Sequence, residues 1–176
     1  MTVLLVTWSP SAEPALADRL VGAAVEGFGP VARGCRVTRH CPRCGSSEHG
    51  RPLLAPHRSG GPLPHVSISR TDDLTVVAVT DAGPVGVDVE VLAGSGRSGI
   101  DGRTWVRTES LLKATGQGLS VHPGDVSLSG PQGGVWTFDL DLTLGHLAAV
   151  TVVADESPSP VVRRAAPGGR ARRATP

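Results

Sequence analysis

The chain has 176 residues and a formal net charge of +1, which gives no sign of a nucleic-acid partner. Hydrophobic residues make up 39% and aromatic residues only 3%, so one ordinary domain or two very small ones must build a core from Val, Leu and Ala. The 23 Gly and 15 Pro indicate short elements joined by many turns. No apolar run approaches the length of a membrane span, so we expect no membrane partner.

The first 62 residues predict one strand followed by one helix. Residues 2–8 are rich in Val and Leu, which favours a strand. Ser11 is a candidate N-cap for a helix that runs to about Phe28, because apolar residues follow it at i+4 spacing. We expect residues 1–62 to form an abbreviated N-terminal subdomain.

A cysteine-rich stretch near residue 40 leaves two interpretations open. The candidate metal ligands are Cys35, His40, Cys41, Cys44 and His49. A Cys-x-x-Cys pair with nearby histidines has the chemistry of a zinc site. A structural zinc site usually shows a second spaced pair, which is missing here, and this favours a plain turn with reduced thiols.

The cysteines and the first residues also bear on the compartment. Three cysteines, an odd number, fit a reducing compartment better than a set of disulfides. The apolar run from Val3 to Val6 is too short for the apolar region of a signal peptide and has no basic stretch before it. We therefore expect a cytoplasmic protein.

From residue 64 onward, apolar and polar residues alternate in a pattern typical of strands. Strands are expected over residues 65–69, 74–80 and 85–91, separated by turns, as a three-stranded antiparallel meander. The last of these strands carries Asp88 and Glu90, which project to the same face, whereas the valines between them face a core. Two carboxylates this close repel each other unless a cation lies between them, and a hard divalent cation prefers oxygen ligands. The alternative is an edge strand with a solvated acidic face.

A helix is expected to follow, from Trp105 to about Thr115, with Thr104 as N-cap and Gly116 at its C-terminal end. Glu109 and Lys113, the only lysine of the chain, lie four positions apart on one face of this helix. An exposed ion pair of this kind contributes only a few tenths of a kcal/mol, which is the alternative to a functional role.

The rest of the chain predicts strands over residues 125–128, 134–140 and 146–154, and then a tail rich in Pro, Ala and Arg. We expect residues 63–155 to form a C-terminal subdomain and residues 156–176 to be a disordered basic tail. The expected fold class is α+β, with antiparallel strands packed against the second helix.

Five segments follow one another along the chain in a recognisable order. They are His49 to Pro52, Val66 to Ser69, Val85 to Glu90, Trp105 to Leu119 and Gly145 to Val150. Together they resemble the 4′-phosphopantetheinyl transferase superfamily, of the surfactin-synthetase-activating type, over roughly residues 40–154. The decisive part is Gly-Val-Asp-Val-Glu followed by Trp-x-x-x-Glu-x-x-x-Lys.

The resemblance implies a Mg²⁺-dependent transfer of 4′-phosphopantetheine from coenzyme A to a serine of an acyl or peptidyl carrier protein. It implies that Asp88, Glu90 and Glu109 hold Mg²⁺ against the pyrophosphate of coenzyme A. Glu109, or a water on the metal, would take the proton of the serine, and Lys113 would stabilise the leaving 3′,5′-ADP.

The resemblance also assigns the coenzyme pocket and the overall architecture. Arg51 matches a position that contacts the nucleotide phosphates, and Ser67 matches one that lines the coenzyme A pocket. The family fold consists of two similar subdomains with the active site between them. Because the first subdomain is abbreviated here, we expect a more open site or a homodimer that completes it.

Three features of the chain differ from the family pattern. Ile68 replaces the histidine of the Ser-His-Ser motif, and Thr108 replaces the lysine before the helix glutamate. Residues 91–104 are also shorter than the usual helical segment. These differences leave open a second interpretation, a catalytically weak or inactive relative that binds a carrier protein or a nucleotide.

Overall fold

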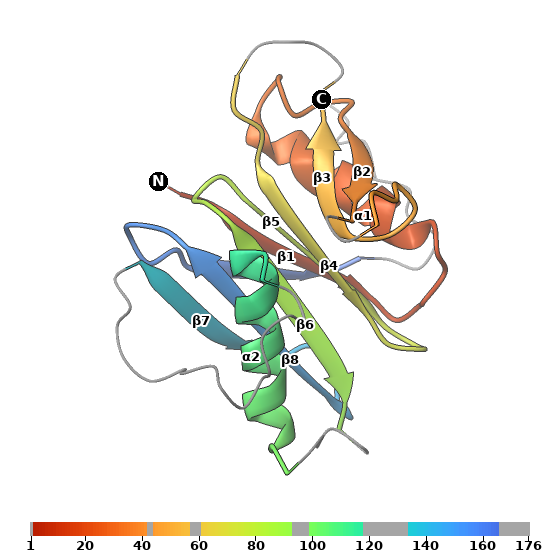
Figure 1. Ribbon diagram of the computed structural model, residues 1–176, viewed down its shortest axis with the longest axis vertical. Helices are drawn as coiled ribbons and strands as arrows, with labels where there is room; N and C mark the ends of the chain where they lie inside the picture. Colours follow the sequence, from red (N-terminus) through yellow and green to blue (C-terminus); the bar gives the residue numbers. More distant parts are fainter. Residues whose placement is uncertain (1, 42–43, 57–60, 93–98, 118–133, 166–176) are drawn as a thin grey trace, which may run out of the picture.

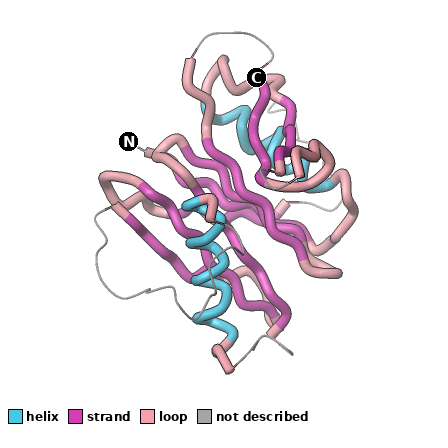
Figure 2. The backbone as a smooth tube through the Cα atoms, in the orientation of Figure 1, coloured by secondary structure: helices cyan, strands magenta, loops and turns pink. Residues whose placement is uncertain are grey.

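The computed structural model describes residues 2–41, 44–56, 61–92, 99–117 and 134–165. Within them the chain is α+β, as expected, with mainly antiparallel sheets and two α-helices (Figures 1 and 2). The elements are β1 (Leu4–Ser9), α1 (Leu16–Val25), the 3-10 helix η1 (Glu26–Phe28), β2 (Arg36–His40), β3 (Arg51–Ala55), β4 (His65–Arg70), β5 (Thr75–Thr80), β6 (Val85–Val91), α2 (Gly102–Thr115), β7 (Val135–Leu140), β8 (His146–Val153) and β9 (Pro160–Arg164).

The largest sheet has the strand order β4-β5-β1-β9 and is covered on one face by α1. The side chains of β5 point alternately to the two faces of the sheet and are buried on both. Val77 and Val79 pack against α1, whereas Val76 and Ala78 face the second sheet. α1 begins at Leu16 rather than after Ser11. The carbonyl of Ser11 accepts a hydrogen bond from the Thr75 hydroxyl (2.7 Å), which fixes this residue to β5 instead of the helix.

The second sheet has the order β6-β8-β7, with antiparallel neighbours, and packs face to face against the first. Val85, Val87 and Val89 of β6 enter the core between the sheets, as the alternation predicts. The opposite face of this sheet is covered by α2, which lies along β6 and β8 (Figure 1). The layers are therefore α1, the first sheet, the second sheet and α2.

The predicted three-stranded meander is wrong in its third strand. β4 and β5 form the expected hairpin, but β6 pairs with β8 and belongs to the other sheet. The chain crosses between the sheets at Gly83, which has a φ of 152° and lies so close to the Val153 carbonyl that a Cβ would be 2.1 Å from that oxygen. Pro84 then accepts a hydrogen bond from the Val153 amide (2.9 Å) and aligns the start of β6 with β8.

The sheets do not divide at the expected boundary between residues 62 and 63, because β1 pairs with β5 across it. The structure also differs from the expected disorder of the tail over residues 160–164, where β9 pairs in parallel with β1. This pairing occupies an otherwise open edge of β1, and the guanidinium of Arg164 lies 5.1 Å from the centre of the Trp8 ring. The predicted strand over residues 125–128 and the last eleven residues of the tail, 166–176, lie outside the described residues.

Candidate functional site

The centre of the candidate site is Asp88, on the face of β6 that is turned toward α2. Its side chain is almost fully buried, and Oδ1 accepts hydrogen bonds from Ser69 Oγ (3.0 Å) and Lys113 Nζ (2.6 Å). The second oxygen, Oδ2, is buried and accepts no hydrogen bond from any described residue. A buried carboxylate oxygen without a donor is costly, so this atom is the strongest indication that Asp88 meets a ligand.

Gly86 explains how Lys113 reaches this aspartate. It lies on the same face of β6 as Asp88, and a Cβ here would be 2.0 Å from the Ser110 carbonyl oxygen and 2.5 Å from the Ala114 amide nitrogen. α2 therefore packs directly against the β6 backbone, which is possible only without a side chain. The glycine of the Gly-Val-Asp-Val-Glu sequence thus positions the helix over the carboxylate.

The sequence predicted the residue at the C-terminal end of α2 but not the residue at its N-terminal end. Asp101, rather than Thr104, is the N-cap, because its Oδ1 accepts hydrogen bonds from the amides of Arg103 (3.1 Å) and Thr104 (3.0 Å). Gly116 ends the helix in the left-handed conformation (φ 74°), as predicted. This places Trp105, Glu109 and Lys113 along one stripe of the helix.

The other two expected metal ligands are Glu90, on β6, and Glu109, on α2 between the residues that contact Glu90 and Asp88. Glu90 is the next residue on the same face of β6, and its Oε1 accepts a hydrogen bond from Trp105 Nε1 (3.1 Å). Glu109 lies one helical turn before Lys113, and its Oε1 is inaccessible to solvent. Thr108, beside it, is buried, so a lysine in its place would lose its water.

The electrostatics of Asp88 are dominated by burial. Burial removes water from the Asp88 carboxyl and thereby raises its pKa. Hydrogen bonds and charge from Lys113, and the hydrogen bond from Ser69, oppose this increase, whereas the charge of Glu90 adds to it. The ionised carboxylate is thus costly even beside its lysine. A divalent cation would lower this cost more than a single ammonium does.

The carboxylates are less tightly grouped than a preformed metal site. Among the described residues, only one group of three or more Cys, His, Asp and Glu side chains has all its ligand atoms within 4.8 Å of one another. That group does not include Asp88, Glu90 or Glu109. The carboxylates nevertheless have the chemistry for Mg²⁺, which commonly takes one or two protein carboxylates and completes its shell with phosphates and water. The buried Oδ2 of Asp88, which accepts no hydrogen bond from any described residue, fits that requirement.

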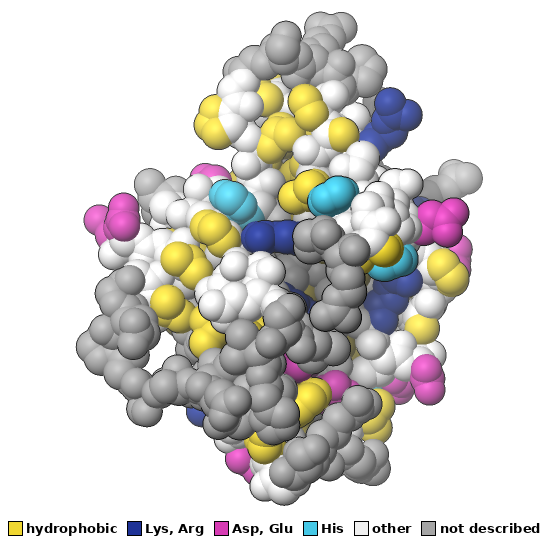
Figure 3. Space-filling model, in the orientation of Figure 1, with side chains coloured by type: hydrophobic (Ala, Val, Ile, Leu, Met, Phe, Trp, Pro, Cys, Tyr) yellow, Lys and Arg dark blue, Asp and Glu magenta, His cyan; other side chains and the backbone are white. Residues whose placement is uncertain are grey.

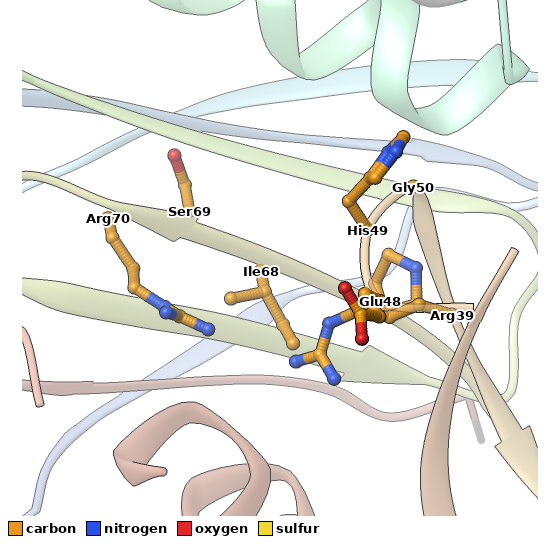
Figure 4. A pocket seen from close by; sticks show the side chains of 8 residues that line it. Arg39, Glu48, His49, Gly50, Ile68, Ser69 and Arg70 are labelled. Atoms are coloured by element: carbon orange, nitrogen blue, oxygen red, sulfur yellow. The ribbon is translucent and has the colours of Figure 1, made fainter. Parts of the chain in front are cut away.

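A hollow of about 330 Å³, shown in Figure 4, has Ser69 in its wall. It lies between β4 and the segment that leads into β3, and is lined by Arg39, Glu48, His49, Gly50, Pro52, Ile68, Ser69 and Arg70. Ser69 links the hollow to the Asp88–Lys113 pair, because it lines the hollow and its hydroxyl contacts both Asp88 and Lys113 (3.2 Å).

Two arginines give this hollow a positive character that the sequence analysis missed. Arg39 and Arg70 extend toward Ile68 from opposite sides (Figure 4). Arg39 also forms an ion pair with Asp18 (2.7 Å). In the space-filling view, histidine and basic side chains gather across the middle of the face shown (Figure 3). Arg70 could have been predicted from the sequence, because it directly follows Ser69 at the end of the expected strand.

Ser67 and Arg51, the two expected coenzyme contacts, lie elsewhere. The Ser67 hydroxyl is buried and accepts a hydrogen bond from the Val87 amide (3.0 Å), and the Ser69 hydroxyl accepts the corresponding bond from the Val89 amide (3.3 Å). Arg51 donates to the Ala114 carbonyl (3.5 Å), near the C-terminal end of α2, and lines a separate hollow of about 260 Å³. Ser69, rather than Ser67, therefore lines the hollow beside Asp88.

Comparison with known proteins adds no assignment. No protein-family model matches the chain, and no curated protein matches it at a significant level. Among the described residues, no helix is both long and apolar enough to cross a membrane.

Proposed function

We propose that this protein transfers 4′-phosphopantetheine from coenzyme A to a serine of an acyl or peptidyl carrier protein in the presence of Mg²⁺. The observation that carries the proposal is the buried Asp88, whose Oδ2 has no donor among the described residues and whose Oδ1 meets Lys113 beside a basic hollow. Asp88 and Lys113 offer an oxygen ligand and an ammonium, and the hollow on the other side of Ser69 offers two guanidinium groups. Groups of these kinds suit a pyrophosphate ester.

Asp88 and Glu90, with Glu109 from α2, would hold the cation. When bound, Mg²⁺ neutralises charge on the pyrophosphate and on the leaving phosphate. Arg39 and Arg70 would bind the phosphates of the nucleotide in the hollow through charge-assisted hydrogen bonds, which are stronger than neutral ones.

In the reaction, the serine oxygen of the carrier protein forms a bond to the β-phosphorus of coenzyme A. The bond from that phosphorus to the oxygen of 3′,5′-ADP breaks, and Glu109 takes the proton of the serine. Without a cation, Lys113 neutralises Asp88. The same ammonium would stabilise the charge on the leaving phosphate.

Mass spectrometry of a carrier protein tests this proposal directly. Incubation with coenzyme A, Mg²⁺ and the protein is expected to add the mass of phosphopantetheine to the carrier. The addition should disappear with a chelator and with Asp88→Ala, but persist with Asp72→Ala, a matched change at an exposed aspartate outside the site. An unchanged mass for every acyl and peptidyl carrier tested would refute the enzyme.

A second candidate function is the binding of a carrier protein or a nucleotide without catalysis. The wide spacing of the carboxylates and the apolar Ile68 between the two arginines favour it. Titration calorimetry that finds binding of a carrier protein or 3′,5′-ADP, together with no mass change, would support this function over the enzyme.

A further inference from the structure

The loop that joins β2 to β3 carries a cluster with a chemistry different from that of the carboxylates. The Sγ atoms of Cys41 and Cys44 and a ring nitrogen of His49 all lie within 4.8 Å of one another. Cys44 Sγ is 3.3 Å from His49 Nε2. Two thiols and an imidazole are soft and borderline ligands, which suit zinc rather than magnesium.

The spacing of these atoms fits a tetrahedral ion. Bonds of about 2.3 Å to sulfur and about 2.0–2.1 Å to nitrogen separate neighbouring ligand atoms by roughly 3.5–3.8 Å around such an ion. The observed separations require only small side-chain movements to reach that geometry.

Backbone hydrogen bonds shape the turn that carries the two cysteines. The Gly45 amide donates to the Cys41 carbonyl (2.8 Å), and the Cys41 amide donates to the Ser46 carbonyl (3.0 Å), which closes a tight turn. Gly45 has a φ of 72°. Gly50 has a φ of 106°, and a Cβ there would lie 2.3 Å from the His40 carbonyl oxygen, so the loop returns against the end of β2.

The hairpin is attached to the core through Val37 and Leu54, which pack against the α1 cluster. β2 and β3 form a sheet of their own, and most of their side chains are exposed or half-buried. A two-stranded hairpin is marginal in water unless something else holds it. A metal ion that joins residues at both ends of its loop would add a second constraint, at the end of the hairpin that carries the loop.

We propose that Cys41, Cys44 and His49 bind a zinc ion, with water or another ligand at the fourth position. The two cysteines bind as thiolates and release their protons on binding, and the neutral imidazole binds through one nitrogen. The ion fixes the loop that supplies Glu48, His49 and Gly50 to the wall of the hollow. The proposal is independent of the transferase activity.

The third cysteine provides a matched control. Cys35 Sγ donates to the Val31 carbonyl (3.5 Å), and neither Cys35 nor His40 belongs to the cluster. Cys35→Ser thus removes a thiol without removing a proposed ligand, whereas Cys44→Ser and His49→Gln each remove one.

The test uses the reduced full chain, stripped with a chelator and then given zinc chloride or cobalt chloride. After removal of unbound metal, the wild type and Cys35→Ser are expected to retain an equimolar amount of zinc. With cobalt they should show a sulfur-to-cobalt charge-transfer band, which carboxylate-bound cobalt lacks. Cys44→Ser and His49→Gln should lose most of the zinc and weaken or shift the band.

A thermal unfolding measurement keeps the test decisive if a variant does not fold. The chelator should lower the Tm of the zinc-loaded wild type and of Cys35→Ser. Zinc retention that is the same in Cys44→Ser as in the wild type would overturn the proposal, as would a wild type without the charge-transfer band or a disulfide between Cys41 and Cys44 that forms even in the presence of zinc.

Discussion

Lys113 Nζ and Asp88 Oδ1 lie 2.6 Å apart and join α2 to β6, and both contact Ser69, which lines the basic hollow. The aspartate is nearly buried, whereas the lysine side chain is 31% exposed. The lysine therefore keeps enough contact with water to leave the pair, and the carboxylate remains where it is. This asymmetry suits a site in which a cation replaces the ammonium.

Asp88→Asn is expected to leave the Tm unchanged or to raise it at neutral pH in the presence of a chelator. Burial raises the pKa of Asp88 despite Lys113, which means that the ionised carboxylate costs folding free energy. Asparagine retains an oxygen for Ser69 and Lys113 without that charge. The same variant should lose the phosphopantetheinyl transfer. A clearly lower Tm by calorimetry would contradict this account of Asp88.

Lys113→Met is expected to lower the free energy of unfolding by about 1–3 kcal/mol, because it leaves a buried carboxylate without its cation. The double variant with Asp88→Asn should recover most of that loss, since the charge that needed the lysine is gone. Urea unfolding of the two single variants and the double variant measures this coupling. Additive effects would show that the two side chains do not interact.

Gly86→Ala is expected to destabilise the protein by about 2 kcal/mol or more, because the new methyl group forces α2 away from β6. Gly22→Ala is the matched control. Gly22 lies inside α1, and a methyl group there would have nothing within 4 Å, so alanine should stabilise the helix by up to about 1 kcal/mol. Thermal unfolding distinguishes the two, and equal effects would contradict the close packing at Gly86.

The contact between α2 and β7 should make stability fall at acidic pH. Hydrogen bonds from the Arg107 guanidinium, together with Arg103, hold the pKa of Asp139 below its ordinary value. As the pH falls, the unfolded chain binds a proton at this residue before the folded chain does. The stabilisation is therefore present above the ordinary pKa of aspartate and is lost as the pH falls through the lowered value.

Asp139→Asn is expected to lower the Tm at neutral pH and to flatten its dependence on pH in the acidic range. Asp155→Asn removes a charge near the end of β8 and serves as control. If the wild type and Asp139→Asn lose Tm in parallel on acidification, Asp139 does not carry this dependence.

Arg70→Ala is expected to raise the KM for coenzyme A roughly tenfold or more, since a charge-assisted hydrogen bond to phosphate contributes about 1.5–3 kcal/mol. Arg36→Ala, at an exposed arginine of β2 away from the hollow, should leave the KM unchanged. Equal KM values for the two variants would exclude the hollow as the site of the nucleotide phosphates.

Much of the local structure follows from residue types and their spacing. The alternation in β6 placed the valines in the core and Asp88 on the opposite face, and Gly116 ended α2 where expected. Both features depend on the geometry of one element, in which a period of two or a left-handed glycine acts over a few residues. The spacing of Glu109 and Lys113 likewise placed them on one helix face.

The tertiary structure alone decided which elements meet. β6 joined β8 instead of β5 because Gly83 and Pro84 redirect the chain, and β9 formed on a strand far from it in sequence. The same holds for the site, where Ser69 rather than Ser67 reaches Asp88 because the β4 and β6 edges meet in that register. Sequence determined the faces of each element, whereas their partners depended on contacts between distant residues that no local pattern encodes.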